Sequence, residues 1–443
     1  MKKIVLVLAL AITTQAKAIN YYFSSVSGND TRTAVQARNP STPWQTIDKL
    51  NQVMSQLQPG DSVLFKRGET FYGSITISIS GNESQPIVFS AYGTGNKPII
   101  SGFTTINGWV PIGGGISEST CTNCKTSLNM VTLNDTLQPI GRFPKLNAAN
   151  GGYWTINSHG QNTVQSGDLA GQPNYTGGEI VMRKYQWIMD RAVINSQSGT
   201  SISYTPMMAP RHPNYNYEPF DGHGFFIQNH PATLTLPGDW SYEKATKKIK
   251  MYQPGSSTVK ATTLETLVNA KHQKYVTFLR LAFEGSNLKT FNLVSCHNII
   301  ISHCDMNFAG TDAINFDTDS LFRNIIPDSS LRLPDYDPSY EDEFRDVNAA
   351  PRYVNTDTSY AMTIEYCTIN NTNNNAFFAS NTYKSIIQNN LITNTALNRG
   401  MGLSGDQQYF AMLYIGSKSI VRNNIVRRTG YIGIHFEGDS TII

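Results

Sequence analysis

The sequence predicts an all-β protein built as a right-handed parallel β-helix, a solenoid in which each coil contributes three short strands. Three observations support this fold class. Segments of apolar–polar alternation recur with one internal phase in the second half of the chain. The recurring unit is about 23 residues long, which is typical of stacked repeats. Asn, Ser, Thr and Gly cluster between the alternating segments, as expected where tight turns join strands.

Five segments define the repeat. Each begins with an apolar anchor, has a turn residue three positions later and a second apolar residue two positions after that. The anchors are 23, 63, 23 and 34 residues apart, so two coils carry insertions. Asn in a turn tolerates left-handed geometry and can stack amide on amide between coils. The predicted turn column is Leu281, Cys304, Cys367, Asn390 and Asn424; the anchors are Phe278, Ile301, Ile364, Ile387 and Val421.

The N-terminus predicts a signal peptide over residues 1–18. Lys2 and Lys3 precede an apolar run too short to span a bilayer, and "AKA" ends the segment with a small-x-small site. Cleavage removes three lysines and no acid, so the 35 basic and 32 acidic residues become equal in number. A neutral mature chain gives no reason to expect a nucleic-acid partner, and no later stretch predicts a membrane span. We expect a secreted or periplasmic bacterial monomer.

Residues 19–139 are expected to form an N-terminal cap and the first coils. The cap contains a helix with an apolar stripe at Ile47, Leu50, Val53 and Leu57, which would cover the open end of the solenoid. The segment "YYFSSVSGND…STPWQTIDKLNQVMSQLQPGDSVLFKRGETFYGSITI", together with "KPIISG" at 97–102, resembles the entry region of the pectate-lyase-like β-helix superfamily. That superfamily includes many secreted carbohydrate-active enzymes, so the resemblance implies a carbohydrate substrate.

Residues 140–156 and 224–254 resemble the additional β-rich region of some β-helix glycosidases. Residues 140–272 are predicted to be an insertion, with coils resuming over 273–443. Within residues 19–139, Cys121 and Cys124 form "CTNC" in a Gly/Ser/Thr-rich loop. A local disulfide is one interpretation of this pair. A redox motif or a zinc site is disfavoured, because the strand–helix setting and a second ligand pair are both missing.

A polar stripe is predicted along one face of the solenoid. If Ile314 and Phe316 point inward, then Asn315 and Asp317 point outward, since successive side chains in a strand face opposite ways. On a later coil, Met401 and Leu403 are expected to point inward. By the same alternation, Gly402 and Ser404 would then point outward and continue the stripe. Aromatic faces stack on sugar rings and polar groups bond hydroxyls, so the substrate-binding candidates are Asn315, Asp317, Phe378, Ser404, and the loop residues Tyr336 and Tyr340. An ordinary solvated sheet is the alternative.

The catalytic candidates are carboxylates on this stripe. Asp317 and Glu437 lie three coils apart, roughly 14 Å, whereas glycoside hydrolysis requires two carboxyls about 5–9.5 Å apart. Glu437 is therefore expected to pair with Asp406, and His435 to orient one of them. The acidic stretch at 335–346 is either a Ca²⁺ site or a solvated loop; no metal is required for the hydrolytic reaction.

Three functional classes fit this sequence. A glycoside hydrolase acting on a plant or algal polysaccharide is favoured. A polysaccharide lyase of pectate or alginate type would need a basic residue as its base, and the stripe has none, although Arg399 and Arg422 lie nearby. A non-catalytic carbohydrate-binding or adhesin-like β-helix would need no site.

The C-terminal residues predict a further coil. Residues 416–421 match residues 438–443 position for position, with nothing after the second copy. We expect the chain to be a fragment that is truncated within its solenoid, with the catalytic centre at or just beyond its end.

Overall fold

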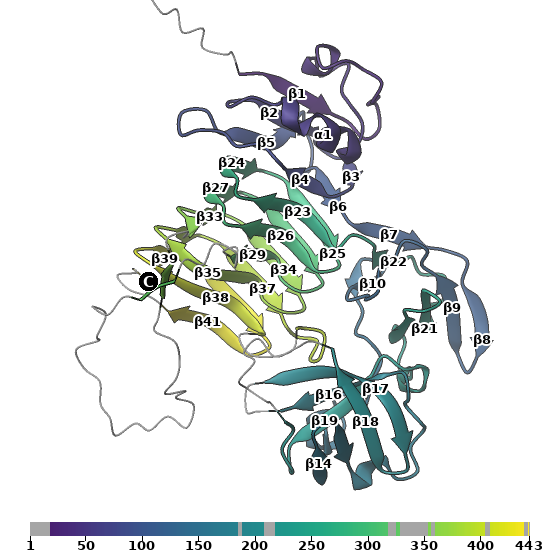
Figure 1. Cartoon of the computed structure of the whole chain (residues 1–443). Coiled ribbons are helices and arrows are strands. Elements are labelled where there is room, and N and C mark those ends of the chain that lie inside the picture. The colour runs from purple at the N-terminus through teal and green to yellow at the C-terminus, as the bar shows by residue number, and fades with distance from the viewer. Residues whose placement is uncertain are drawn as a thin grey trace, which may run out of the picture.

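A computed structural model describes residues 18–184, 188–207, 218–317, 325–327, 353–355, 359–403, 408–437 and 442. The described chain coils into a parallel β-helix, which confirms the predicted fold (Figure 1). An N-terminal cap covers one end of the coils, and an insertion of antiparallel strands lies beside them.

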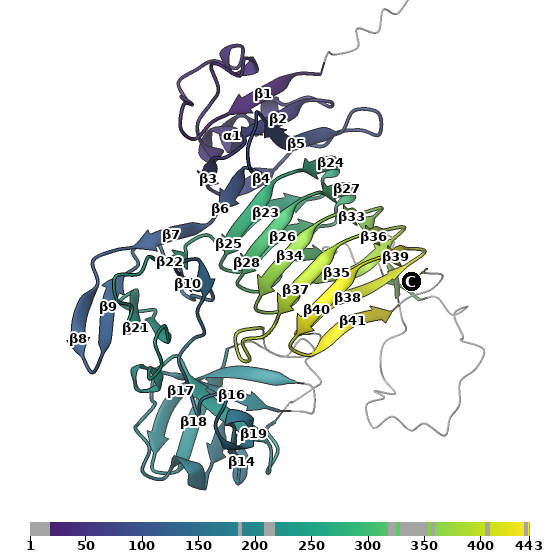
Figure 2. The ribbon, with the colours of Figure 1, turned by 180° about the vertical axis from the view of Figure 1, so that it is seen from behind.

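Three parallel sheets run along the solenoid, and we call them sheets 1, 2 and 3. Sheet 1 consists of β4 (Ile75–Ile77), β23 (Thr266–Lys271), β26 (Lys289–Val294), β29 (Ile314–Asp317), β35 (Phe377–Tyr383), β38 (Phe410–Ser417) and β41 (Ile432–Glu437). Sheet 2 consists of β1 (Asn20–Phe23), β2 (Ser62–Lys66), β5 (Ile87–Tyr92), β24 (Lys274–Leu279), β27 (His297–Ser302), β33 (Thr363–Glu365), β36 (Ile386–Gln388) and β39 (Ile420–Arg422). Sheet 3 consists of β3 (Thr70–Tyr72), β6 (Ile99–Ser101), β25 (Ala282–Ser286), β28 (Asp305–Ala309), β34 (Thr368–Thr372), β37 (Leu391–Thr395) and β40 (Ile425–Thr429). Figure 2 shows the same stack from behind.

The predicted turn column is confirmed. The five anchors lie opposite one another in sheet 2, and the second apolar positions do so in sheet 3. At the turn between these sheets, Cys304 and Cys367 direct their thiols at the carbonyls of Phe278 and Ile301. Asn390 Nδ2 donates to the carbonyl of Ile364 in the same way. Cys and Asn therefore play one role, which is to join each turn to the preceding coil.

The cap is the predicted amphipathic helix. Helix α1 (Ile47–Val53) begins after Thr46, whose hydroxyl accepts a hydrogen bond from the Lys49 amide, as at many helix N-termini. Its apolar stripe is buried in the main core of the coils. The helix is followed by the 3-10 turn η2 (Met54–Gln56), and η1 (Gln36–Arg38) precedes it. This packing keeps water from the first coil.

The insertion leaves the coils after β6 and returns at β23, whereas we expected it to begin at residue 140. Its strands pair antiparallel in three sheets. The insertion thus interrupts one coil between its strand in sheet 3, β6, and its strand in sheet 1, β23. The coil is still completed, because β23 pairs with β4 in sheet 1. The strands are β7 (Phe103–Ile106), β8 (Val110–Gly113), β9 (Ile116–Thr120), β10 (Val131–Leu133), β11 (Thr136–Leu137), β12 (Arg142–Phe143), β13 (Trp154–Thr155), β14 (Ser158–Gly160), β15 (Thr163–Gln165), β16 (Glu179–Arg183), β17 (Met189–Ser198), β18 (Ser201–Pro206), β19 (Gly224–Gln228), β20 (Trp240–Glu243), β21 (Lys248–Tyr252) and β22 (Val259–Thr262), with short helices α2 (Ala149–Gly152), η3 (Gly167–Leu169) and η4 (Pro231–Thr233).

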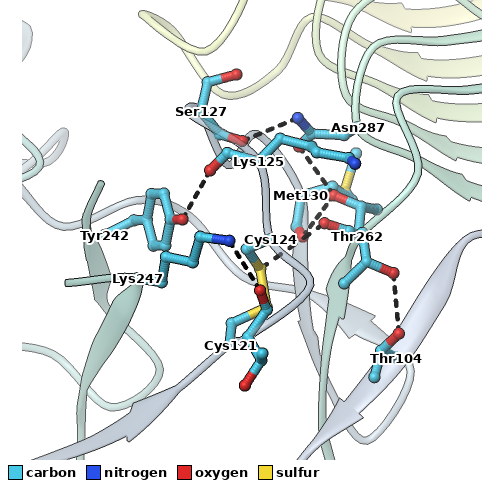
Figure 3. Close-up of a disulfide and its surroundings, with 12 residues drawn as sticks. Thr104, Cys121, Cys124, Lys125, Ser127, Met130, Tyr242, Lys247, Thr262 and Asn287 are labelled. Carbon is cyan, nitrogen blue, oxygen red and sulfur yellow. Dashed lines mark hydrogen bonds between the residues drawn. A yellow bond between two sulfur atoms is a disulfide. The ribbon is translucent and has the colours of Figure 1, made fainter. Parts of the chain in front are cut away.

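A disulfide joins Cys121 to Cys124 near the base of the insertion (Figure 3). The segment that follows is tied to the coils, because Asn287 Nδ2 of the first full coil donates to the Ser127 carbonyl. It is also tied to β20, because the Tyr242 hydroxyl donates to the Lys125 carbonyl. The insertion is thus fixed to the corner between sheets 3 and 1.

Two further parts of the fold follow the sequence. Within residues 318–358, β30 (Ile325–Pro327) and β31 (Tyr353–Asn355) pair antiparallel with each other. The next strand, β32 (Ser359–Tyr360), pairs with β27 and β35. Near the end, Ile442 pairs with Ile420 in parallel, as the matching residues 416–421 and 438–443 predict.

Candidate active site

The outer face of sheet 1 carries the residues that we singled out. One position repeats along it, and the register fixes which side chains are neighbours on consecutive coils. From the cap toward the C-terminus, that position is occupied by Asn269, Asn292, Asn315, Phe378, Leu413 and His435. The face is therefore polar in its first half and apolar before it ends on a histidine.

The polar half is an asparagine ladder. Asn315 Nδ2 lies 3.3 Å from Asn292 Oδ1, and Asn292 Nδ2 lies 3.5 Å from Asn269 Oδ1. Lys289 Nζ also donates to Asn292 Oδ1 at 3.3 Å. Asn315 faces outward as predicted, but it is only 6% exposed. Its amide donates to the ladder, while Asp317 follows it at the end of β29.

Phe378 requires a correction. We expected its ring to stack on a sugar, but the side chain is 3% exposed. It packs with Phe410 and Leu413 in an apolar cluster on the outer face, separate from the main core. Since the next coil presents leucine at the same position, the ring is buried against its neighbours and is unavailable as a stacking surface.

The fourth coil also differs from the expectation. Met401 and Leu403 were expected to occupy its sheet 1 strand, but β38 places Met412 and Tyr414 opposite Phe377 and Ala379. Met401 instead packs in the core of the insertion. The chain between β37 and β38 is thus a long loop that reaches the insertion. Ser404 and Asp406 of this loop lie outside the described residues, as do Tyr336, Tyr340 and the acidic stretch at 335–346.

His435 and Glu437 lie together on β41, the last described strand of sheet 1. His435 Nε2 is 2.8 Å from Glu437 Oε1, and the two side chains are 36% and 53% exposed. The edge of the His435 ring contacts Phe410, with ring centroids 5.4 Å apart. The imidazole therefore contacts an apolar ring and the carboxylate at the same time, so it can orient that carboxylate.

Two residues at the corner between sheets 3 and 1 were missed by the sequence reasoning. Asp312 is 3% exposed, and its Oδ1 accepts hydrogen bonds from Asn374 Nδ2 at 2.7 Å and the Asn375 amide at 3.0 Å. Asn374 Oδ1 in turn accepts from the Tyr409 amide. The motif "GTDAINFD" contained Asp312, but no periodic signal distinguished it from an ordinary turn residue.

Tyr409 is the second missed residue. Its side chain is 7% exposed, and its hydroxyl has no hydrogen-bond partner in the described part of the chain. Burial raises the pKa of this hydroxyl, and the charges of Arg191 and Asp190 in the insertion also act on it. A buried, unpaired hydroxyl is uncommon and calls for a specific reason. Its position between coil and insertion makes it a candidate group for contacting a ligand.

The insertion side of this junction is built from buried ion pairs. Arg191 bonds Glu179 at 2.9 Å, with both side chains at most 10% exposed, and Lys184 lies 3.1 Å from Asp190. Gln228 Nε2 donates both to Glu179 and to the Gly400 carbonyl of the β37–β38 loop. Buried pairs cost desolvation but hold one geometry when fully bonded, so the loop is held rigidly against the insertion.

A pocket of about 340 Å³ opens between the insertion and this loop. We call it the junction pocket. It has apolar walls with several cationic side chains. Its lining is Pro139, Ile140, Arg142, Lys145, Leu146, Asn147, Leu236, Asp239, Leu397, Asn398, Arg399 and Met401.

Another carboxyl of interest, that of Glu284, lies on sheet 3. Burial raises the pKa of Glu284, which lines a pocket with Asp305 and Lys97. Lys97 Nζ is 2.8 Å from Asp305 Oδ1. Because this pocket is on a different sheet from His435 and Glu437, the two carboxylate groups are independent and can be tested separately.

Neither a metal-binding cluster of His, Cys, Asp and Glu side chains nor a helix able to cross a membrane occurs among the described residues. Cys296, Cys304 and Cys367 are free thiols and buried. They belong to the turns and have no place in a metal site.

Comparison with known proteins supports the fold and adds a sequence relationship. No family model matches the chain. A stretch of 94 residues is 38% identical to a lacto-N-biosidase of Bifidobacterium longum subsp. longum, and it spans 20% of this chain and 6% of that protein. A solved glycoside hydrolase superposes with a TM-score of 0.60 at 12% identity, covering 96% of both chains. XylC in complex with xylose superposes with a TM-score of 0.50 at 12% identity, over 96% of this chain and 61% of XylC. The β-helix fold of carbohydrate-active proteins is thereby confirmed.

Proposed function

We propose that the protein is a secreted glycoside hydrolase that cleaves a polysaccharide along the outer face of sheet 1, beside the insertion. The observation that carries the proposal is the Glu437 carboxylate, which is exposed on the last described strand of that face and lies 2.8 Å from His435 Nε2. The stretch shared with lacto-N-biosidase and the fold shared with a glycoside hydrolase support it.

Glu437 is the proposed catalytic carboxylate. Its partner cannot be Asp317, because three coils place them about 14 Å apart and the chemistry requires about 5–9.5 Å. Asp406, in the loop that precedes β38, is the proposed partner. His435 is the proposed positioning group, because its Nε2 lies within hydrogen-bond distance of Glu437 Oε1 and can orient that carboxylate.

A polysaccharide panel tests this proposal. The full-length protein is incubated with neutral and acidic polysaccharides, with and without a chelator. New reducing ends without ultraviolet absorbance would support hydrolysis. Unsaturated products that absorb in the ultraviolet would identify a lyase instead. Binding without products would identify a carbohydrate-binding β-helix.

A further inference from the structure

The junction pocket contains more positive charge than its own residues neutralise. Lys145 pairs with Asp239, with side chains 15% and 5% exposed, so these two charges cancel. Arg142 donates to the backbone carbonyls of Pro144 and Gly152 and to no carboxylate of the described residues. Arg399 is exposed and likewise forms no ion pair with the described residues. Two guanidinium groups therefore share the pocket without a counter-charge from the described residues.

These two cations are close enough to repel each other. Burial, together with the neighbouring charge of Arg399, lowers the pKa of Arg142 to about 10. Arg142 still carries its charge at neutral pH. A bound anion would relieve this repulsion, because an opposite charge within a few ångströms stabilises both cations.

The pocket walls are suited to an organic anion. Leu146, Leu236 and Leu397 line it and are 50%, 51% and 37% exposed, although they come from three separate segments. Exposed apolar side chains gathered at one place mark binding surfaces. Asn147 and Asn398 add amides that can bond hydroxyls. The volume lies near the lower end of the range for small-ligand pockets, about 300–1,000 Å³, which suits one or two sugar rings.

The Arg142 guanidinium and the backbone beside Arg399 are held in place before any ligand arrives. The Arg142 guanidinium lies 3.5 Å from the centroid of the Phe226 ring. Arg399 precedes Gly400, whose carbonyl accepts from Gln228. Gly400 has φ +83°, and a Cβ there would lie 2.7 Å from Gln228 Oε1, so glycine allows the loop to approach this closely. Preorganised charges lose little freedom on binding, which favours affinity.

We propose that the junction pocket is a subsite for an acidic sugar, in which Arg399 and Arg142 bind its carboxylate or sulfate group. This inference rests on the proposed function, since it names the class of polysaccharide that the enzyme takes. The loop that carries Arg399 leads into β38, the neighbour of the strand that carries His435 and Glu437. An acidic residue of a polysaccharide seated there would position the chain relative to the outer face of sheet 1.

Binding of small probes tests the subsite without requiring catalysis. Galacturonate, glucuronate, galactose 6-sulfate, inorganic sulfate, galactose and glucose are titrated calorimetrically into the wild type, Arg399→Gln and Arg427→Gln. Arg427 is an exposed arginine of β40 outside the pocket, so its variant is the matched control. Loss of a charge-assisted bond should weaken an acidic sugar about tenfold or more in Arg399→Gln and leave Arg427→Gln unchanged. Comparison of the affinities for the two uronates and for galactose 6-sulfate shows whether the subsite prefers a carboxylate or a sulfate group.

Several outcomes would overturn the subsite. These are acidic sugars that bind no tighter than galactose, equal binding by Arg399→Gln and the wild type, or binding of inorganic sulfate alone. Gly400→Ala gives a second check, since displacing the loop should weaken the same acidic sugar. Hydrolysis of neutral polysaccharides is measured separately. Hydrolysis without binding of acidic sugars would contradict the subsite and support the proposed hydrolase. Arg399-dependent binding of acidic sugars without hydrolysis would support the subsite and contradict the proposed hydrolase.

Discussion

Replacement of Asn390 by Ala should destabilise the coils strongly. The side chain is 2% exposed and forms three hydrogen bonds. Its Oδ1 accepts from the Cys367 amide at 2.9 Å, and its Nδ2 donates to the Ile364 carbonyl at 3.0 Å and to Asn424 Oδ1 at 2.9 Å. Each bond contributes about 1 kcal/mol net, and the buried partners left behind add to the loss, so we expect about 3–5 kcal/mol. That is a large part of the stability of a typical domain.

Urea denaturation followed by tryptophan fluorescence measures this loss. Asn107→Ala, at an exposed asparagine of the insertion, should change the free energy of unfolding by less than about 0.5 kcal/mol. Asn390→Cys should lie between the wild type and Asn390→Ala, since a thiol can approach the Ile364 carbonyl as Cys367 approaches that of Ile301 at 3.4 Å. A loss below about 1 kcal/mol for Asn390→Ala would refute the idea that the column holds the coils together.

Four other changes test the site and the core. Glu437→Gln should lower the rate of hydrolysis at least about 100-fold, while Glu284→Gln on sheet 3 should leave it unchanged. Loss of hydrolysis in Glu284→Gln alone would show that the catalytic centre is on sheet 3. Tyr409→Phe should keep or slightly raise the melting temperature, because it removes an unpaired buried hydroxyl. The same change should lower activity, because we expect this hydroxyl to contact the substrate. Activity equal to that of the wild type would count against this role. Alanine at both Tyr336 and Tyr340 should weaken polysaccharide binding in affinity electrophoresis, and unchanged mobility would exclude them from the groove. Burial raises the pKa of the Cys367 thiol to about 12, so the unfolded thiol, near 8.5, loses its proton first. Stability should therefore fall as pH rises from about 9 to 12, with a smaller fall in Cys367→Ala; identical pH profiles would contradict this.

The coils could be predicted because their constraints repeat. From the second coil on, the turn residue meets the corresponding backbone carbonyl of the preceding coil, so the sequence returns to Cys or Asn at that position after Leu281. Side-chain direction was predictable for a similar reason. Phe291, Ile314 and Phe316 point inward as strand alternation requires, and each is fully buried. Both features depend on local geometry and on one neighbouring coil.

Exposure on the outer face could not be predicted in this way. Alternation places Asn315 and Phe378 outside the main core but does not say what covers them. In the structure both are nearly buried, one in the asparagine ladder and the other under Phe410 and Leu413. Whether an outward side chain meets solvent, a sugar or protein depends on loops and insertions far away in the sequence. The same limit hid Asp312, whose partners come from the next coil.

The misplaced strand of the fourth coil shows where periodicity stops being a guide. On the third coil, Cys367 precedes Phe377 by ten residues, but on the fourth, Asn390 precedes its counterpart Met412 by 22. The segment "MGLSG" imitates the expected alternation, yet two glycines disfavour a strand, and "FAMLY", which begins nine residues further on, has much better strand formers. The extra residues are the loop that places Arg399 in the junction pocket and Gly400 against Gln228. A break in the repeat releases a stretch of chain from core packing, and this stretch is free to reach the insertion and build a binding surface. The 34-residue spacing shows that the fourth coil contains a break. The position of the break and its contacts with the insertion become visible only in the structure.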